Sequence, residues 1–174
     1  MSSLSVYHVS SPQLPDKVLT HLEDIASTLK EHGIGFERRQ ALTPVRPGAA
    51  AQEVLDAYRA QLDELITAFG CQSVEVISED GMQLSTSAVA EQVCASNDVH
   101  WMVAGRGLLS LHIGDYVYAL FCERHDLVSM AAGTRHWFDA GEHPHLIAVH
   151  LSTAAPGPTG DDTAGRFPRL DDLL

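Results

Sequence analysis

The sequence predicts a mainly β fold, in which an antiparallel barrel follows two N-terminal helices within a single domain. Apolar residues recur at helical spacing in the first 70 residues, and the period changes after that point. From His100 onward, short runs rich in Val, Leu, Tyr and Trp are separated by glycines, at Gly105, Gly107, Gly114, Gly133 and Gly141. Strands at such close intervals are typical of an antiparallel barrel or sandwich. A chain of 174 residues with 45% apolar residues is sufficient to close one core.

The two helices and the first barrel strand are predicted from local pattern. Residues 16–30 carry apolar side chains at helical spacing, and Gly33 is a stop signal just beyond them. Residues 49–69 form a second apolar face, which Gly70 closes. Residues 73–77 alternate between apolar and polar side chains, as a half-buried strand does. We therefore expect helix, helix and then strands.

This pattern divides the chain into three regions. Residues 1–72 are an N-terminal elaboration of helices and strands, 73–151 are the barrel, and 152–174 are a tail that packs on the barrel. Within the tail, residues 154–160 are small and rich in proline and glycine, which predicts an irregular strap. The segment 166–170 is expected to dock back on the barrel.

Composition limits the partners. Eleven Lys and Arg residues against 23 Asp and Glu give a formal net charge of −12. Nucleic acid and anionic membranes need a basic footprint, so a small molecule is the expected partner. No apolar run approaches the roughly 20 residues that span a bilayer, and no signal peptide is recognisable, so we expect a cytoplasmic monomer or homodimer. Three cysteines without CxxC spacing do not imply disulfides.

Five segments carry a resemblance to a known family. They are 103–108 (VAGRGL), 111–118 (LHIGDYVY), 122–129 (CERHDLVS), 132–139 (AGTRHWFD) and 159–170 (TGDDTAGRFPRL). In order and spacing they closely resemble the acireductone dioxygenases, which are cupin enzymes of methionine salvage. The resemblance implies a cupin double-stranded β-helix, or jelly-roll barrel, and the activity of a metal-dependent oxidoreductase.

The resemblance also implies a metal site, from which this chain departs. The family binds Fe²⁺ or Ni²⁺ through an H-x-H pair, a Glu four residues later and a third His on a later strand, and such imidazole and carboxylate ligands suit these ions. The later His matches His136. The Glu position falls on Asp98, and the two H-x-H positions fall on Cys94 and Gln92. The chain is thus a divergent member that lacks the H-x-H pair.

These replacements leave two interpretations open. Asp98 can still be a ligand, Cys94 can bind a softer ion as a thiolate, and Gln92 is a weak neutral donor. In the other interpretation, Cys94 is a small buried apolar residue and Gln92 is exposed.

A second candidate metal set comes from strand alternation. Two Arg positions of the family hold His100 and His150 in this chain. Because side chains alternate along a strand, Asp98 and His100 should both point inward, as should His136 and His150. These four residues form the preferred candidate site for a divalent metal, with the three histidines as candidate catalytic groups. The alternative is a water-filled pocket in which the histidines form hydrogen bonds with one another. Met102 and Phe138 are expected to line the substrate pocket.

The leading functional hypothesis is an acireductone-dioxygenase-like oxygenase that acts on a small enediol, keto acid or related substrate other than the salvage acireductone. By resemblance its metal is Fe²⁺ or Ni²⁺. One alternative is a metal-free isomerase, lyase or decarboxylase that uses His100, His136 and His150 for proton transfer, since imidazole titrates near neutral pH. Another is a cupin that binds a small molecule without catalysis.

Overall fold

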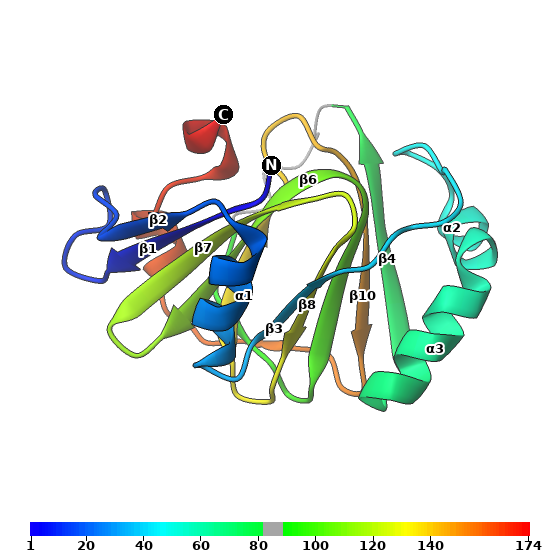
Figure 1. The fold of residues 1–174 in the computed structure, drawn as a ribbon, viewed down its shortest axis with the longest axis horizontal. Helices are drawn as coiled ribbons and strands as arrows, with labels where there is room; N and C mark the ends of the chain where they lie inside the picture. Colours follow the sequence, from blue (N-terminus) through cyan, green and yellow to red (C-terminus); the bar gives the residue numbers. More distant parts are fainter. Residues whose placement is uncertain (82–88) are drawn as a thin grey trace.

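The computed structural model describes residues 1–81 and 89–174 and shows a mainly β molecule with helices outside it (Figure 1). The helices are α1 (Leu22–Lys30), α2 (Ala51–Ala57) and α3 (Arg59–Phe69), and two 3-10 helices, η1 (Thr163–Arg166) and η2 (Leu170–Leu173), lie in the tail. The described strands are β1 (Ser3–His8), β2 (Lys17–Leu19), β3 (Gly35–Arg38), β4 (Ser73–Asp80), β5 (Gln92–Val93), β6 (Asp98–Ile113), β7 (Tyr116–Glu123), β8 (Asp126–Met130), β9 (Arg135–Asp139), β10 (His145–Ser152) and β11 (Gly157–Pro158).

The strands form two antiparallel layers that share β6. The N-terminal half of β6 pairs with β8 and β10, and β3 and β4 extend this layer on its two sides. The C-terminal half of β6 pairs with β7 and β9, and the second layer continues through β1 and β2 on one side and through β5 and β11 on the other. The sheet is open rather than closed, because β2 and β11 are its end strands. The predicted double-stranded cupin architecture is confirmed.

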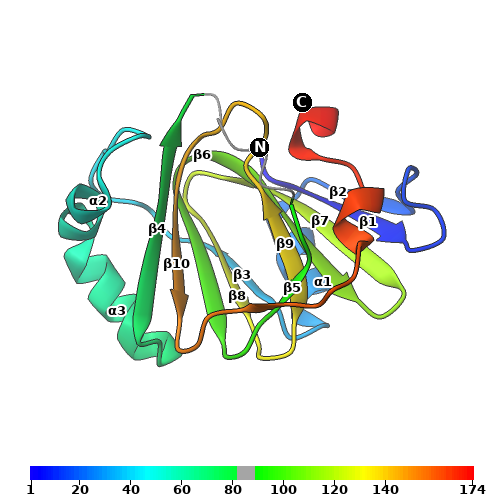
Figure 2. The same ribbon diagram turned by 180° about the vertical axis from the view of Figure 1, so that it is seen from behind.

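Three apolar clusters hold these layers. The inner one lies between the two layers and includes Leu109, Leu120 and Leu146. A second cluster packs α2 and α3 against the outer face of the layer that contains β4 and β10, and Figure 1 shows both helices beside β4. A third cluster seats the tail, which runs past β5 and β9 in Figure 2. None of the described helices is long and apolar enough to cross a membrane.

The predicted first helix was too long at its N-terminal end. It was expected over residues 16–30 and begins at Leu22, because Lys17–Leu19 pairs as β2 with the edge of β1. Val18, which the helical pattern counted as apolar and inward, is 55% exposed. The backbone hydrogen bonds offered by the free edge of β1 outweigh the local helical period.

The predicted second helix is interrupted at Tyr58. It was expected without a break over 49–69, and the structure has α2 and α3 with a non-helical Tyr58 between them. Tyr58 is 1% exposed, its ring meets Trp101 edge-on at a centroid distance of 5.5 Å, and its hydroxyl donates to the carbonyl of Thr43. This tertiary anchoring of an aromatic side chain overrides the periodic pattern.

Aromatic and charged contacts hold the tail against β1 and β9. Phe167 lies against Tyr7 and Trp137, with ring centroids 5.9 and 6.1 Å away. Arg169 makes a bidentate contact with the buried carboxylate of Asp139, at 2.7 Å from Nε and 3.1 Å from the terminal nitrogen. The backbone N–H groups of Leu170 and Gly141 donate to the same carboxylate. Asp139 therefore closes the last segment of the chain onto β9.

We expect Gly105→Ala to destabilise the protein strongly. Gly105 has φ +74° where β6 passes from one layer to the other, and an added Cβ would lie 1.9 Å from the carbonyl oxygen of His145. Backbone strain and overpacking each cost about 1–3 kcal/mol, so the loss should be about 3 kcal/mol or more. Urea denaturation measures it, and Gly165→Ala, where nothing lies within 4 Å, is the control. Equal midpoints for the two variants would contradict this account.

We expect Arg169→Ala to lower the free energy of unfolding by about 1.5–3 kcal/mol at pH 7, because a charge-assisted contact to a buried carboxylate is lost. Burial raises the pKa of Asp139, but hydrogen bonds from Arg169, Leu170 and Gly141 outweigh it and hold the pKa below its usual range. The ionised form of a group with a depressed pKa stabilises the fold above the unfolded value of about 3.9. The difference between wild type and Arg169→Ala should therefore be constant above about pH 5 and shrink as the pH falls below about 4. A difference that grows in acid would refute the pairing.

Candidate metal centre

Strand pairing brings the four residues of the preferred candidate site together. His100 on β6 lies directly opposite His150 on β10. Asp98 begins β6 and pairs with Met130 of β8, while His136 lies on β9, opposite Leu111 of β6. The bend of β6 thus brings β9 over the end of the strand that carries Asp98. The predicted inward direction of these side chains agrees with their burial, since all four residues are at most 9% exposed.

The tightest group of possible metal ligands is formed by Cys94, Asp98 and His136. One donor atom from each lies within 4.8 Å of the others, and all three residues are buried. The sulfur of Cys94 and Nδ1 of His136 are 3.5 Å apart. Of the two weaker candidates, the structure therefore brings Cys94 into the group, whereas Gln92 is exposed.

His150 and His100 adjoin this group. Nε2 of His150 lies 3.4 Å from Oδ2 of Asp98, and its Nδ1 lies 3.8 Å from the exposed carboxylate of Glu75. The rings of His100 and His150 are 4.4 Å apart between centroids and inclined by 35°, and His100 is 6.0 Å from His136. The four preferred candidates therefore share one cluster, in which His150 lies next to Asp98 and His100 lies next to His150.

Several atoms of this cluster have no hydrogen-bond partner among the described residues. They are both carboxylate oxygens of Asp98 and the Nε2 atoms of His100 and His150. A buried charged group without partners costs at least several kcal/mol, so such groups are normally paired or bind a metal. The cluster has the composition and the unsatisfied atoms of a binding site.

The donor spacing fits a divalent ion. Bonds of about 2.0–2.3 Å in a tetrahedral shell separate donor atoms by about 3.3–3.8 Å. The three donor atoms need to contract by only about 1 Å to reach that spacing from the 4.8 Å limit. Fe²⁺, Ni²⁺ and Zn²⁺ all accept imidazole and carboxylate ligands, so Asp98 and His136 fit the divalent ion that the resemblance implies.

Burial favours the neutral forms of His100, His136 and the Cys94 thiol in the absence of a cation. It lowers the pKa of His100 well below the usual value, and the neighbouring His150 and His136 add to the effect. Burial likewise lowers the pKa of His136. The pKa of the Cys94 thiol is raised by burial and then by Asp98. Neutral imidazoles can bind a metal directly, whereas the thiol must first lose its proton.

Two residues without an assigned role hold the segment that leads into Cys94. Glu91 is 1% exposed, accepts a hydrogen bond from Thr159 Oγ1 at 2.9 Å and lies 2.8 Å from Nδ1 of His112. These contacts connect β5 to β6 and to the tail. Neither His112 nor Glu91 was singled out from the sequence as a candidate for the site. A buried acid adjacent to the candidate ligands was the signal available.

The predicted pocket walls lie next to the cluster. Met102 is 2% exposed in the inner core, and the ring of Phe138 lies 6.0 Å from that of His100. Phe138 occupies this place because Gly107 has no side chain, since a Cβ there would lie 2.4 Å from the Phe138 ring. Phe138 therefore lies beside His100, and Met102 belongs to the apolar core that also includes Cys94.

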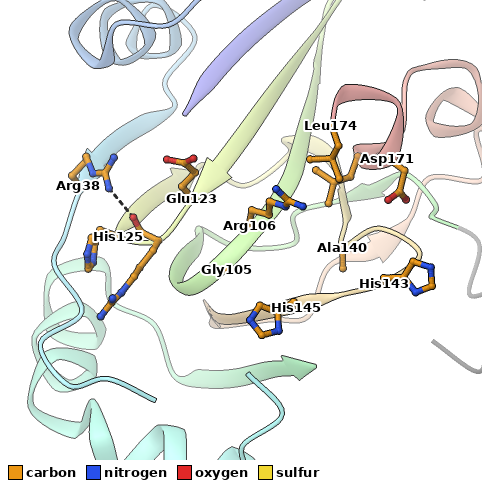
Figure 3. A pocket seen from close by; sticks show the side chains of 12 residues that line it. Arg38, Gly105, Arg106, Glu123, His125, Ala140, His143, His145, Asp171 and Leu174 are labelled. Carbon is orange, nitrogen blue, oxygen red and sulfur yellow. Dashed lines mark hydrogen bonds between the residues drawn. The ribbon is translucent and has the colours of Figure 1, made fainter. Parts of the chain in front are cut away.

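A separate cavity of about 530 Å³ lies away from the cluster, at the start of β10 (Figure 3). Its walls include Arg38, Arg106 and His145. These three side chains do not converge on one point. Arg38 donates to the carbonyl of Arg124, Arg106 extends toward Leu174 in Figure 3, and His145 is paired with Asp80 at 2.9 Å. This cavity therefore lacks the focused, unsatisfied groups of the cluster.

The fold and the cluster define a cupin with a buried group of possible metal ligands. The model of the ARD/ARD' family matches residues 7–159, and the chain belongs to this family. It is 55% identical to the acireductone dioxygenase of Pseudomonas syringae pv. tomato, 52% identical to that of Pseudomonas fluorescens and 48% identical to that of Pseudomonas aeruginosa, over 99% of this chain and all of each relative.

A solved structure shows the same fold. It is the acireductone dioxygenase from Bacillus anthracis with a cadmium ion in its active centre, which superimposes with a TM-score of 0.71 at 17% identity. The match covers 90% of this chain and 95% of that one. The predicted family membership is confirmed.

We expect Asp98→Asn to stabilise the metal-free protein by about 1–3 kcal/mol, because the amide carries no charge to desolvate. The same variant should lose the rise in melting temperature that a divalent metal gives to the wild type. Thermal unfolding after treatment with a chelator, and again with added metal, measures both effects. Glu75→Gln is the control, because Glu75 is exposed and should change neither value. A destabilised metal-free Asp98→Asn would contradict the assignment.

Proposed function

We propose that this protein is a metal-dependent oxidoreductase of the dioxygenase type, acting in the cytoplasm on a small enediol, keto acid or related molecule other than the salvage acireductone. Membership in the ARD/ARD' family and the cupin fold support the dioxygenase class. The three described cysteines are free and buried, which suits a reducing compartment. The state of assembly that we propose is a monomer or a homodimer.

The buried Asp98 is the observation that carries the metal-dependent part of this proposal. Its carboxylate has no hydrogen-bond partner in the described structure and lies within reach of His136 and His150. A resident divalent ion would neutralise it, and by resemblance the ion is Fe²⁺ or Ni²⁺. When bound, the ion would supply a Lewis acid that can hold a pair of substrate oxygens.

The other residues of the cluster would then act on the substrate. His100 has a free Nε2 in a buried position and a lowered pKa, so it is neutral at pH 7 and can accept a proton from an enediol hydroxyl. Phe138 and Met102 are apolar walls that exclude water from that step. His150 would keep Asp98 in position.

The charge of the cluster argues against the salvage acireductone as the substrate. A dianionic enediolate is held best by fixed positive charge, and the family has two Arg residues where this chain has His100 and His150. Burial keeps His100 neutral, so it supplies no such charge at pH 7. A substrate with less negative charge suits this site better.

A metal-free isomerase, lyase or decarboxylase is the second candidate function. The adjacent rings of His100 and His150 favour it, because two imidazoles side by side can exchange protons with a ligand. Metal analysis of protein purified without added metal separates the two proposals. Near-stoichiometric metal supports the oxygenase, and its absence supports the metal-free enzyme.

We expect this protein, loaded separately with iron and with nickel, to turn over the salvage acireductone roughly two to four orders of magnitude more slowly than a family member with both Arg residues. Each lost charge-assisted contact removes about 1.5–3 kcal/mol of substrate binding in the transition state. Anaerobic generation of the acireductone, followed by admission of oxygen, measures the rate. Turnover equal to that of such a relative would show that the replacements are silent.

We expect His136→Ala to fold normally, to bind divalent metal at least tenfold more weakly and to lose activity on the substrate once that is known. Its far-UV circular dichroism should match that of the wild type, and equilibrium dialysis measures the metal. His143→Ala, an exposed residue outside the cluster, is the control and should behave as the wild type. Unchanged metal binding in His136→Ala would refute the site.

A further inference from the structure

We propose that Cys94 is itself a ligand of the metal, as a thiolate, and completes a mixed centre with Asp98 and His136. The inference rests on the proposed function only in requiring that a divalent metal binds at this cluster. It makes the centre chemically different from one built of imidazoles and a carboxylate alone.

The backbone around Cys94 fixes its sulfur at the cluster. The Cys94 N–H donates to the carbonyl of Thr134 at 2.9 Å, and the Gly133 N–H donates to the Cys94 carbonyl at 2.8 Å. These two bonds tie Cys94 to the turn that leads into β9, two residues before His136. The sulfur lies 3.5 Å from Nδ1 of His136, a nitrogen that is also 3.3 Å from the carbonyl of Thr134. A separation of about 3.3–3.8 Å is compatible with two ligands of one tetrahedral ion.

The anchor of Glu91 fixes the segment from its other end. Glu91 is buried between His112 and Thr159, three residues before Cys94. Because the segment is held on both sides of Cys94, it loses little conformational freedom when the cysteine binds an ion. The position of the sulfur is therefore set by the fold before any metal arrives.

The other two cysteines do not share this environment. The sulfur of Cys122 lies 3.6 Å from the carbonyl of Leu120, and that of Cys71 lies 4.0 Å from the carbonyl of Phe69. Within residues 1–81 and 89–174, the group around Cys94 alone brings three side chains of the ligand-forming types this close together. Burial by itself therefore does not account for the place of Cys94.

The unsatisfied carboxylate of Asp98 is the second and independent sign of a cation. A thiolate and a carboxylate together carry two negative charges, which a divalent ion neutralises in full. The neutral imidazole of His136 then completes a ligand set with no net charge, which is the least costly state in a buried site.

Thiolate ligation changes which ions the centre prefers. Sulfur is a soft donor, so Cd²⁺, Zn²⁺ and Co²⁺ should bind far more tightly than the hard ions Mn²⁺ and Mg²⁺. Binding also requires that the Cys94 thiol lose its proton to solvent as the sulfur–metal bond forms. Metal binding should therefore release one proton that a centre without the thiolate would not release.

The test is a titration of the metal-free, reduced protein with Co²⁺ and Cd²⁺. In the wild type we expect near-ultraviolet absorption from sulfur-to-metal charge transfer and a released proton for each ion bound. In Cys94→Ala both signals should vanish, and Cd²⁺ should bind at least tenfold more weakly. Cys122→Ala is the matched control, since it removes a buried cysteine outside the group and should keep both signals.

The outcomes separate this inference from the proposed function. Cobalt that binds the wild type without charge-transfer absorption, or absorption that survives in Cys94→Ala, overturns the role of Cys94 and leaves a metal-dependent enzyme standing. A wild type that binds neither ion overturns both. If Cys94→Ala unfolds, the near-isosteric Cys94→Ser is titrated in its place, and retained charge transfer there refutes the proposal in the same way.

Discussion

The bend of β6 is the constraint on which the rest of the structure depends. This one strand of 16 residues belongs to both layers, so every other strand is placed with respect to it. The change of layer occurs at Gly105, where the carbonyl of His145 leaves no room for a Cβ. Because β9 pairs with one half of β6 and β10 with the other, the bend also decides that His136 and His150 approach Asp98 from different sides.

Sequence patterns predicted those parts of the structure that local order determines. Strand alternation placed Asp98 and His100 on one face, and the five matched segments predicted the cupin architecture, because several motifs in order constrain a topology more than composition does. The helices were predicted less well. Tyr58 follows a contact with Trp101, which lies far away in sequence, and β2 follows its pairing with β1. Neither contact leaves a periodic signal.

The candidate site, too, could be predicted only in part from the sequence. His136 was identifiable from its segment, whereas the approach of Cys94 to His136 depends on a backbone hydrogen bond between residues 94 and 134. Counting positions could name Cys94 but could not show where its sulfur lies. Gln92, two residues earlier, also falls on an H-x-H position of the family, but its side chain is exposed. Gln92 pairs directly with His136 in the register of β5 and β9, so burial of the side chain, rather than register, distinguishes the two residues.

Strand β9 joins the site to the outside of the molecule. His136 and Phe138 face the cluster, while the alternate residues Trp137 and Asp139 face outward and receive Phe167 and Arg169 of the tail. The tail therefore braces the outer face of the strand that carries His136. Cleavage of the tail by a protease would disturb the candidate site from a distance, without changing any residue of the cluster.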